Sequence, residues 1–196
     1  MKIHNIDQWT PERFAVRQLK MTASHAQAIG SNGKWLETYI KEMMSEHYSS
    51  AEKEHHSNAH TDRWHELEPL ARWMYELETG NQVTEVWFIE YDEHVWCSPD
   101  GLVNNEWLLE IKCQSDKVHF ELILNGKIDT GYVRQMQMQM YVSGRQWCDF
   151  VAYNPNYKQS LRIKRVHIDP DAQDKLAKWF VSWKSQILEI INKLWH

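Results

Sequence analysis

Cysteine is scarce in the sequence and is not spaced for a metal cluster or a disulfide framework. The chain of 196 residues holds three cysteines, Cys97, Cys113 and Cys148, with no CxxC pair among them. Closely spaced cysteine pairs mark zinc sites and iron–sulfur clusters, and an even number of cysteines is typical of disulfide frameworks. The sequence therefore argues against these classes, and we expect the three thiols to be reduced and partly buried.

Long apolar runs are also missing. No stretch approaches the roughly 18 uninterrupted apolar residues of a membrane span, and the opening residues MKIHNIDQW lack the basic-then-apolar layout of a secretory signal. We therefore expect a soluble, cytoplasmic protein with no membrane partner.

Positive charge is not in excess. The formal net charge is -5, whereas non-specific DNA affinity comes from Lys and Arg residues that neutralise phosphates. The composition thus gives no global electrostatic case for nucleic acid. In metal-dependent nucleases, however, carboxylates lower the net charge while bound cations reverse the local sign. The charge therefore leaves a local DNA site open.

The sequence does contain enough apolar residues for a sizeable core. With 42% hydrophobic and 25% charged residues, the chain is expected to form one domain over residues 1–196, since domains commonly run to about 100–200 residues. The predicted order is N-terminal helices over 10–80, a sheet with one helix over 83–168, and a C-terminal helix over 170–195. This order predicts an α/β fold with a mixed sheet flanked by helices.

Helix signals dominate the segment before Gly80. Thr10-Pro11 offers a capping side chain followed by proline at the first helical position. Good helix formers follow, with apolar residues three and four positions apart, and Gly80 is a typical helix stop. Helices are predicted over 10–20, from Ser24, over 34–47 and over 61–77.

Strand signals dominate after Gly80. Short segments rich in Val, Ile and Trp alternate with polar connections, and the first three predict an antiparallel meander. In the last segment the apolar phase changes between Ile163 and Val166, which indicates a bulge. Strands are predicted over 83–91, 94–99, 107–113, 147–153 and 161–168.

Two further helices are predicted around the last strands. Residues 131–143 alternate polar and apolar with the period of a strand, but Gln and Met are strong helix formers and favour a helix. Residues 114–130 are predicted to be irregular or partly helical. Asp169-Pro170 opens a long amphipathic helix, whose predicted buried stripe is Leu176, Trp179, Phe180, Trp183, Ile187, Ile190 and Leu194.

The segment CSPDGLVNNEWLLEIKC carries the chemistry. Glu110 and Lys112 are two residues apart on a predicted strand, so both project from one face while Ile111 turns into the core. A hairpin through Asn104-Asn105 would bring Asp100 back beside Glu110. Such a pair of carboxylates can hold a hard cation such as Mg²⁺ in the manner of phosphodiesterases.

Each group would have a separate task. Asp100 and Glu110 would hold the metal, and Lys112 would orient the attacking water or deprotonate it. The alternative is a surface salt bridge between Glu110 and Lys112, since an E-x-K pair alone is common. The preceding SPDG turn and the apolar strand favour catalysis.

Several motifs in one order resemble a known family. They are RQLKMTAS, ELEPLARWMYELETG, the SPDG turn, the LEIK strand, RQMQMQMYV and AYNP. Together, from about Arg17 to Pro155, the chain is similar to the PD-(D/E)xK nucleases and, within them, to the group of phage lambda exonuclease and the YqaJ viral recombinases. The resemblance implies a restriction-endonuclease-like core.

The resemblance also implies roles for individual residues. Asp100, Glu110 and the backbone carbonyl of Ile111 would be metal ligands, and Lys112 the catalytic lysine. Glu68, in the helix before the strands, would support a second metal or its water shell. The implied cofactor is Mg²⁺, with Mn²⁺ as a substitute and two ions per active site.

A pocket for a terminal 5′-phosphate is implied as well, formed by Arg17, Ser24, Ser98 and Gln137. Arg can grip phosphate through two N–H groups, and a helix start at Ser24 offers unpaired N–H groups to an anion. Two alternatives stay open. Ser24-His25-Ala26-Gln27 also forms a capping box, and Gln137 on a helix that faces the sheet could be a satisfied buried amide.

The implied activity is a 5′→3′ exonuclease that digests the 5′-ended strand of linear double-stranded DNA. It would release mononucleotides and leave a 3′ single strand for recombination. The resemblance further implies a ring-shaped homotrimer, a phage single-strand annealing protein as partner, and a phage or prophage origin in a bacterial cell. The alternatives are an endonuclease of the same fold and a non-catalytic DNA-end-binding scaffold.

One basic patch stands out from the acidic composition. It consists of Lys158, Arg162, Lys164 and Arg165. It could follow the DNA backbone, or it could be a solvated strand face or a subunit contact.

Overall fold

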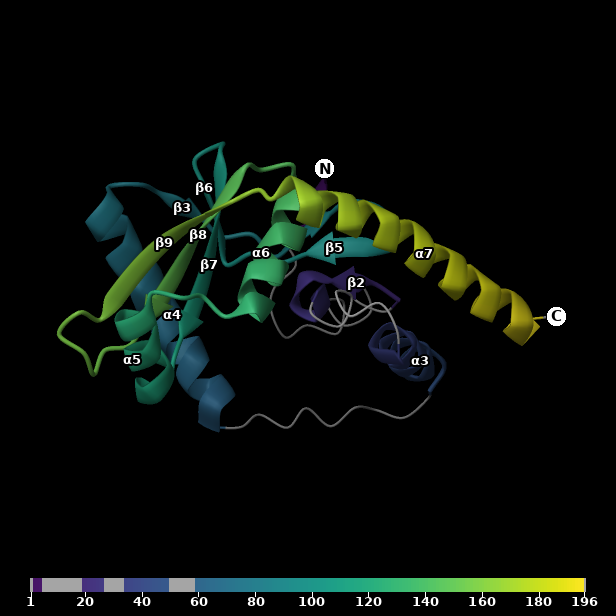
Figure 1. The fold of residues 1–196 in the computed structure, drawn as a ribbon, viewed down its shortest axis with the longest axis horizontal. Helices are drawn as coiled ribbons and strands as arrows, with labels where there is room; N and C mark the ends of the chain where they lie inside the picture. Colours follow the sequence, from purple (N-terminus) through teal and green to yellow (C-terminus); the bar gives the residue numbers. More distant parts are fainter. Residues whose placement is uncertain (1, 5–18, 27–33, 50–58, 196) are drawn as a thin grey trace.

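A computed structural model describes residues 2–4, 19–26, 34–49 and 59–195 (Figure 1). The helices predicted over 34–47, 61–77 and 131–143 are confirmed, and the helix predicted over 10–20 falls largely outside the described residues. The described helices are η1 (Ala23–His25), α3 (Lys34–Tyr48), α4 (Ala59–Thr79), α5 (Asp116–Asn125), α6 (Thr130–Ser143) and α7 (Pro170–Trp195). In the described ranges, none of these has the length and apolar character that a membrane crossing requires.

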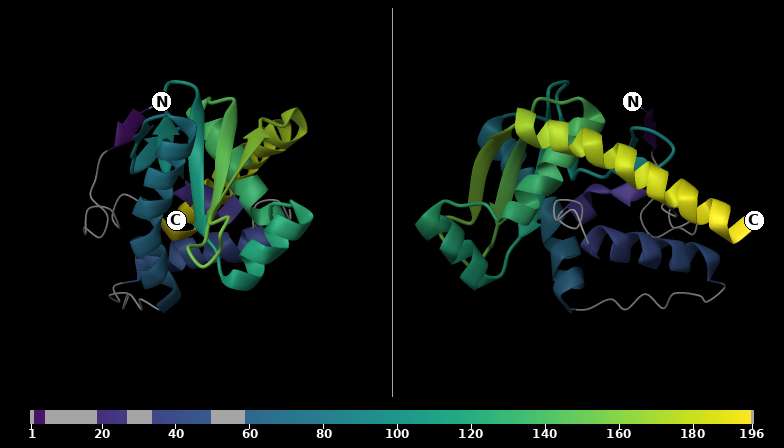
Figure 2. Two further views of the ribbon diagram at one scale, coloured as in Figure 1. Left: turned by 90° about the vertical axis from the view of Figure 1, so that its left-hand side faces the viewer. Right: turned by 45° about the vertical axis from the view of Figure 1, so that its right-hand side comes forward.

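Among the described residues, a five-stranded mixed sheet forms the centre of the fold. Its order is β3 (Val83–Thr84), β6 (Gly101–Val103), β7 (Trp107–Cys113), β8 (Trp147–Tyr153) and β9 (Leu161–His167). β7 runs antiparallel to β6 and parallel to β8. Helices α4 and α6 lie on opposite sides of this sheet (Figures 1 and 2). The predicted mixed α/β fold is therefore confirmed.

Both faces of β7 are covered, which explains why the strand is a nearly continuous apolar run. Leu109 and Ile111 pack in one hydrophobic cluster with Tyr75 of α4. Leu108 packs in a second cluster, on the other face, with Met136 of α6. The alternation predicted for Glu110, Ile111 and Lys112 is thus confirmed, and the two polar side chains of β7 share the face toward α6.

The predicted three-stranded meander is wrong. Residues 83–91 split into β3 and β4 (Phe88–Glu90), which join different sheets. β4 pairs with β5 (Val95–Cys97) in a smaller sheet of order β1 (Lys2–His4), β4, β5 and β2 (Met21–Thr22). The break between β3 and β4 contains Glu85, which forms an ion pair with Arg72 of α4. A segment with a strand-like composition is therefore divided between two sheets, because β3 pairs with β6 whereas β4 pairs with β1 and β5.

The bulge predicted in β9 is also wrong. β8 and β9 pair without an inserted residue, from Trp147 opposite His167 to Tyr153 opposite Leu161. Ile163 packs against the cluster on the α4 side, and Val166 packs against the cluster on the α6 side. The change of apolar phase arises because this edge strand contributes to both cores.

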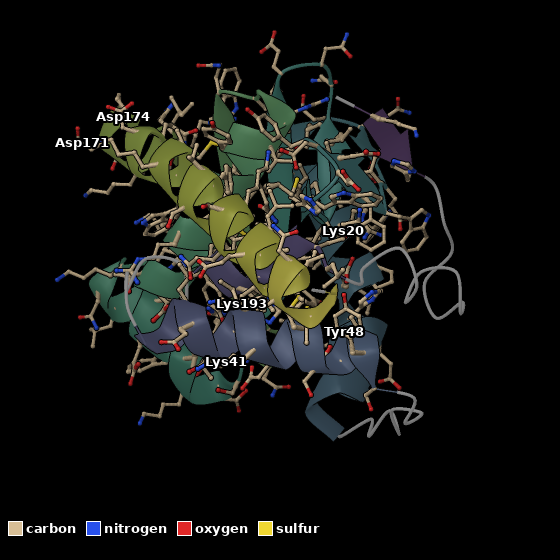
Figure 3. The ribbon with its side chains drawn as sticks, turned by 90° about the vertical axis from the view of Figure 1, so that its right-hand side faces the viewer. Lys20, Lys41, Tyr48, Asp171, Asp174 and Lys193 are labelled. Carbon is tan, nitrogen blue, oxygen red and sulfur yellow. The ribbon has the colours of Figure 1, made fainter. Side chains whose placement is uncertain are left out.

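α7 extends away from the five-stranded sheet and passes over α3 (Figures 1 and 3). The predicted stripe is buried at Leu176, Phe180, Trp183 and Ile187, but Leu194 is 56% exposed, so its predicted burial is wrong. Figure 3 shows Lys193 at this end of α7, above Lys41 and Tyr48 of α3. In the last turns of α7, Ile190 and Leu194 line an apolar groove with residues of α3, and Ile190 also packs against the core.

Candidate active site

Asp100 and Glu110 are brought together by the hairpin of β6 and β7. Gly101 lies opposite Leu109, so Asp100 lies beside Glu110. The Asp100 N–H donates to the Leu109 carbonyl at 3.0 Å, and Asp100 Oδ2 accepts the Ile111 N–H at 2.6 Å. The predicted return of Asp100 to Glu110 is confirmed, and Asp100 directly precedes β6.

Two features of the surroundings of this hairpin determine its position. Arg145, which follows α6, donates through one guanidinium nitrogen to the carbonyls of Trp107 at 2.6 Å and Asn104 at 3.3 Å. At the other end, a Cβ added to Gly101 would lie only 2.3 Å from Val83 Cγ1 of β3. Glycine in the SPDG turn therefore lets β3 approach the strand that follows Asp100.

The Glu110 carboxylate is buried beneath α6. The residue is 0% exposed. Its Oε1 accepts hydrogen bonds from Lys112 Nζ and from Gln135 Nε2, the latter at 2.6 Å. Its Oε2 accepts one from Gln139 Nε2 at 2.6 Å. The Glu110–Lys112 pair is thus present, but it is not the surface salt bridge that was the alternative.

Lys112 lies on the same face as Glu110, with Nζ 5.2 Å from the centre of the Tyr132 ring. Burial by itself lowers the pKa of Lys112, but the negative charges of Glu110 and Asp100 outweigh this effect and raise the pKa above its usual value. A protonated lysine can orient a water or a phosphate oxygen through its N–H donors. Proton abstraction by Lys112 would require a nearby cation to lower this pKa.

Glu68 reaches the same region from α4. It is almost fully buried and paired with Arg72 one turn later. Arg72 also binds Glu85 at 2.8 Å and donates to the Asp100 carbonyl at 3.4 Å. This arginine therefore connects the α4 carboxylate to the backbone that carries Asp100.

The carboxylates of the site influence one another electrostatically. Burial raises the pKa of Asp100 well above its usual value, and the charges of Glu110 and Glu68 add to the rise while Lys112 opposes it. Burial also raises the pKa of Glu68, Arg72 opposes this rise, and Glu110 contributes to it. Crowded carboxylates of this kind are stabilised as anions by a cation between them.

The hairpin of β6 and β7 carries oxygen donors for a divalent metal. Asp100, Glu110 and the Ile111 carbonyl are oxygen donors on one hairpin, and hard cations prefer such ligands. Within the described part of the chain, no group of three or more His, Cys, Asp or Glu side chains could hold a metal ion. Asp100, Glu110 and the Ile111 carbonyl offer two carboxylates and one carbonyl, which are the oxygen donors that suit a Mg²⁺-like ion whose other ligands would be waters.

Two of the residues assigned to the phosphate pocket, Ser24 and Ser98, follow neighbouring strands of the small sheet. β2 and β5 run parallel with Thr22 opposite Trp96, so Ser24 and Ser98 follow their strands at the same edge of the small sheet. Ser98 Oγ donates to the Trp87 carbonyl at 2.5 Å. Arg17 lies outside the described residues.

Ser24 and Gln137 already have hydrogen-bond partners. η1 begins at Ala23 and not at Ser24. The Ser24 hydroxyl lies 3.0 Å from the Thr22 hydroxyl and 3.3 Å from His25 Nδ1, both within hydrogen-bond distance. The Gln137 amide donates to the His167 carbonyl at 2.8 Å and accepts from the Asp169 N–H at 3.0 Å. Gln137 therefore joins the end of β9 to the start of α7.

Three residues of the basic patch form an ion pair or a hydrogen bond within the chain. Arg165 binds Asp149 through Nε at 2.8 Å, Lys164 donates to the Gly126 carbonyl, and Arg162 donates to Gln159. Lys164 and Arg165 thus contact neighbouring elements while both residues stay exposed, so the DNA contact, the solvated strand face and the subunit contact all stay open.

Sequence reasoning missed three residues that contact the site. Nothing in the sequence distinguishes Arg72 from the other charged residues of its helix. Gln135 and Gln139 were passed over in favour of Gln137, which matches the family pattern. The signal was present, because Gln135 and Gln139 are four positions apart and therefore share one helix face, whereas Gln137 faces elsewhere.

The chain is similar to a known protein family and to solved structures. Residues 12–146 match the family model of the YqaJ-like viral recombinase domain. The alkaline exonuclease LHK-Exo of Laribacter hongkongensis is 33% identical, with a TM-score of 0.81 over 94% of this chain and 98% of that chain. Its complex with dAMP gives 34% identity and a TM-score of 0.81, with coverage of 94% and 98%.

A phage-related exonuclease from Haemophilus somnus is similar in fold alone, with 16% identity and a TM-score of 0.67 over 90% of this chain and 97% of that chain. None of the curated proteins matches the chain.

Proposed function

The chain belongs to the YqaJ-like viral recombinase family, and from this premise we propose that it is a divalent-metal-dependent exonuclease that degrades linear double-stranded DNA from its ends. The family and the alkaline exonuclease relative support a nuclease function on DNA. The observation that carries the proposal is the hairpin of β6 and β7, which brings Asp100 beside Glu110, the buried ion-pair partner of Lys112.

The side chains divide the work of hydrolysis in this proposal. Asp100, Glu110 and the Ile111 carbonyl would hold a divalent ion, and the chemistry that such an ion would supply is polarisation of the scissile phosphate and acidification of a water. Lys112 Nζ orients the attacking water and offsets the charge that develops on the phosphate. Glu68, held by Arg72, supports a second ion or its water shell.

The finer parts of the proposal concern direction and product. We propose 5′→3′ digestion, with Mg²⁺ as the natural ion, Mn²⁺ as a substitute and two ions per site. Mononucleotides are released and a 3′ single strand remains for recombination. The relative LHK-Exo was solved with dAMP, a nucleoside monophosphate, which supports this kind of product. Arg17, Ser24, Ser98 and Gln137 would receive the terminal 5′-phosphate, although Gln137 must first exchange a hydrogen bond.

The proposed partners also follow from the family. They are a ring of three copies around DNA and a single-strand annealing protein from the same phage or prophage, inside a bacterial cell. The parallel emergence of Ser24 and Ser98 is consistent with an end-binding pocket, since both follow paired strands. End binding is the feature that separates an exonuclease from an endonuclease of the same fold.

The first experiment compares linear DNA labelled at the 5′ or the 3′ end with covalently closed DNA, in Mg²⁺ or with a chelator. We expect 5′-labelled mononucleotides from linear DNA only, and only with the metal. Asp100→Ala should lose at least about 100-fold in rate, the lower range for a lost catalytic group. Efficient cutting of closed circles would favour the endonuclease, and full activity of Asp100→Ala would refute this site.

A further inference from the structure

Two glutamines of α6 donate hydrogen bonds to the carboxylate of Glu110. Gln135 Nε2 donates to Oε1 at 2.6 Å, and Gln139 Nε2 donates to Oε2 at 2.6 Å. The two glutamines are separated from Glu110 by 25 and 29 positions in the chain. Each oxygen of this buried carboxylate therefore has its own amide donor, in addition to the ion pair with Lys112.

The alternating sequence of α6 produces this arrangement. Gln135 and Gln139 are one helical turn apart and point to the same side. Met136, Met138 and Met140 are all 0% exposed, so the helix is anchored by apolar packing on its other sides. Rotation of the helix that would take the glutamines away from Glu110 would expose these methionines.

The surroundings of Gln139 limit its freedom further. Its backbone carbonyl accepts a hydrogen bond from Ser143 Oγ at 2.7 Å, and the residue is 0% exposed. Only the amide nitrogen can face Glu110 favourably, because the amide oxygen would be repelled by the carboxylate. The Gln139 Oε1 is consequently buried with no hydrogen-bond partner among the described residues.

A buried acceptor without a partner costs free energy, and such groups in native proteins point to a functional constraint. A leucine or methionine at position 139 would avoid this cost, because its side chain carries no polar atom that needs a partner. The gain that offsets the cost is the single hydrogen bond to Glu110 Oε2. This oxygen accepts fewer described hydrogen bonds than Oε1, which leaves it more capacity for a cation.

We propose that Gln135 and Gln139 are positioning residues that set the orientation of the Glu110 carboxylate for a divalent cation, with Gln139 controlling the oxygen that faces the ion. The inference rests on the proposed function, since Glu110 must be a metal ligand. Gln135 has the smaller effect, because Lys112 still binds Oε1 when the Gln135 amide is lost.

The test measures Mn²⁺ binding to the full chain by calorimetry without DNA, and then nuclease rates across a Mn²⁺ series. Gln139→Met keeps the volume and removes the donor. We expect its Mn²⁺ dissociation constant to rise by about 10–100-fold, the usual effect of losing a group that orients a metal ligand. Gln135→Met should weaken binding less. At saturating Mn²⁺ the nuclease rate of Gln139→Met should largely recover.

Gln137→Met is the matched control for metal binding. It also removes a buried amide from α6, but its partners are the His167 carbonyl at the end of β9 and the Asp169 N–H just before α7. We expect lower thermal stability with an unchanged Mn²⁺ dissociation constant. If Gln139→Met fails to fold, Gln139→Asn serves instead, because it keeps the amide but shortens its reach by one methylene, and it should also weaken Mn²⁺ binding.

The outcomes separate the two claims. If the wild-type chain binds no Mn²⁺, the proposed metal-dependent function fails. If the wild type binds Mn²⁺ and the folded Gln139 variants bind it equally well, the positioning role is overturned while the proposed function stands. The same holds if Gln137→Met and Gln139→Met weaken Mn²⁺ binding equally, since the effect would then be structural.

Discussion

Lys112 illustrates how burial changes the meaning of a common sequence pair. On an exposed strand, Glu110 and Lys112 would form a weak ion pair of little consequence. Here the side chains are 1% and 19% exposed, and Tyr132 lies beside the ammonium. Loss of one partner from such a pair therefore leaves a buried charge that something else must compensate.

Lys112→Met should separate catalysis from metal binding. We expect the rate at saturating Mg²⁺ to fall by about 10²–10⁴-fold, the contribution typical of a group that handles a proton. Mn²⁺ binding should be retained or tighter, since a positive charge next to Glu110 is removed. Single-turnover digestion and calorimetry measure the two quantities.

The matched control for Lys112→Met is Lys178→Met, which changes an exposed lysine of α7 and should leave both quantities unchanged. Loss of Mn²⁺ binding in Lys112→Met would mean that the lysine maintains the fold of the site.

Arg72 should contribute mainly to stability. The Glu68–Arg72 pair has side-chain exposures of 10% and 11%, so Arg72→Met leaves Glu68 buried without its partner. We expect the free energy of unfolding to fall by about 3–5 kcal/mol. Urea unfolding followed by tryptophan fluorescence measures this change.

Lys41→Met provides the control on α3. It breaks an ion pair with the same spacing, to Glu37, whose side chains are 68% and 61% exposed. Its loss should be no more than about 0.5 kcal/mol. Equal losses in the two variants would contradict the role assigned to Arg72.

At the scale of elements, Gly101 links the SPDG turn to the packing of β3. An added Cβ would clash with Val83 Cγ1, so Gly101→Ala should lower the free energy of unfolding by about 1–3 kcal/mol, as overpacking does. Val83→Ala removes the clashing atom, and the double variant should be more stable than the sum of the single losses predicts. Urea unfolding of the four proteins gives this coupling energy, and additive losses would refute the steric explanation.

The elements themselves were predictable to different degrees. β7 and β8 match their predicted limits of 107–113 and 147–153, because sustained runs of Val, Ile, Leu and Trp are a strong local signal. β6 was missed, since three residues are too few to establish a period. β3 and β4 were merged because the pairings that assign them to different sheets involve strands elsewhere in the chain.

At the scale of the whole molecule, the proposed ring of three copies can be tested by measuring the molar mass of the particle. We expect light scattering coupled to gel filtration to give a particle of three times the 23.5 kDa chain mass, since cyclic closure leaves no unpaired interface. Dilution should not change this mass in the nanomolar to micromolar range. A monomer that retains full exonuclease activity would contradict the ring.

The sequence by itself determined the limits of β7, the helical state of α6 and the arrangement of Asp100, Glu110 and Lys112 on one hairpin, because side-chain period and motif order are local properties of the chain. Only the tertiary structure decided which strands pair and which side chains grip Glu110. Those contacts join positions 25 and 29 residues apart, and their formation depends on how β7 and α6 pack. The proposed metal-binding groups thus come from one segment, whereas the amide donors to the Glu110 carboxylate come from α6.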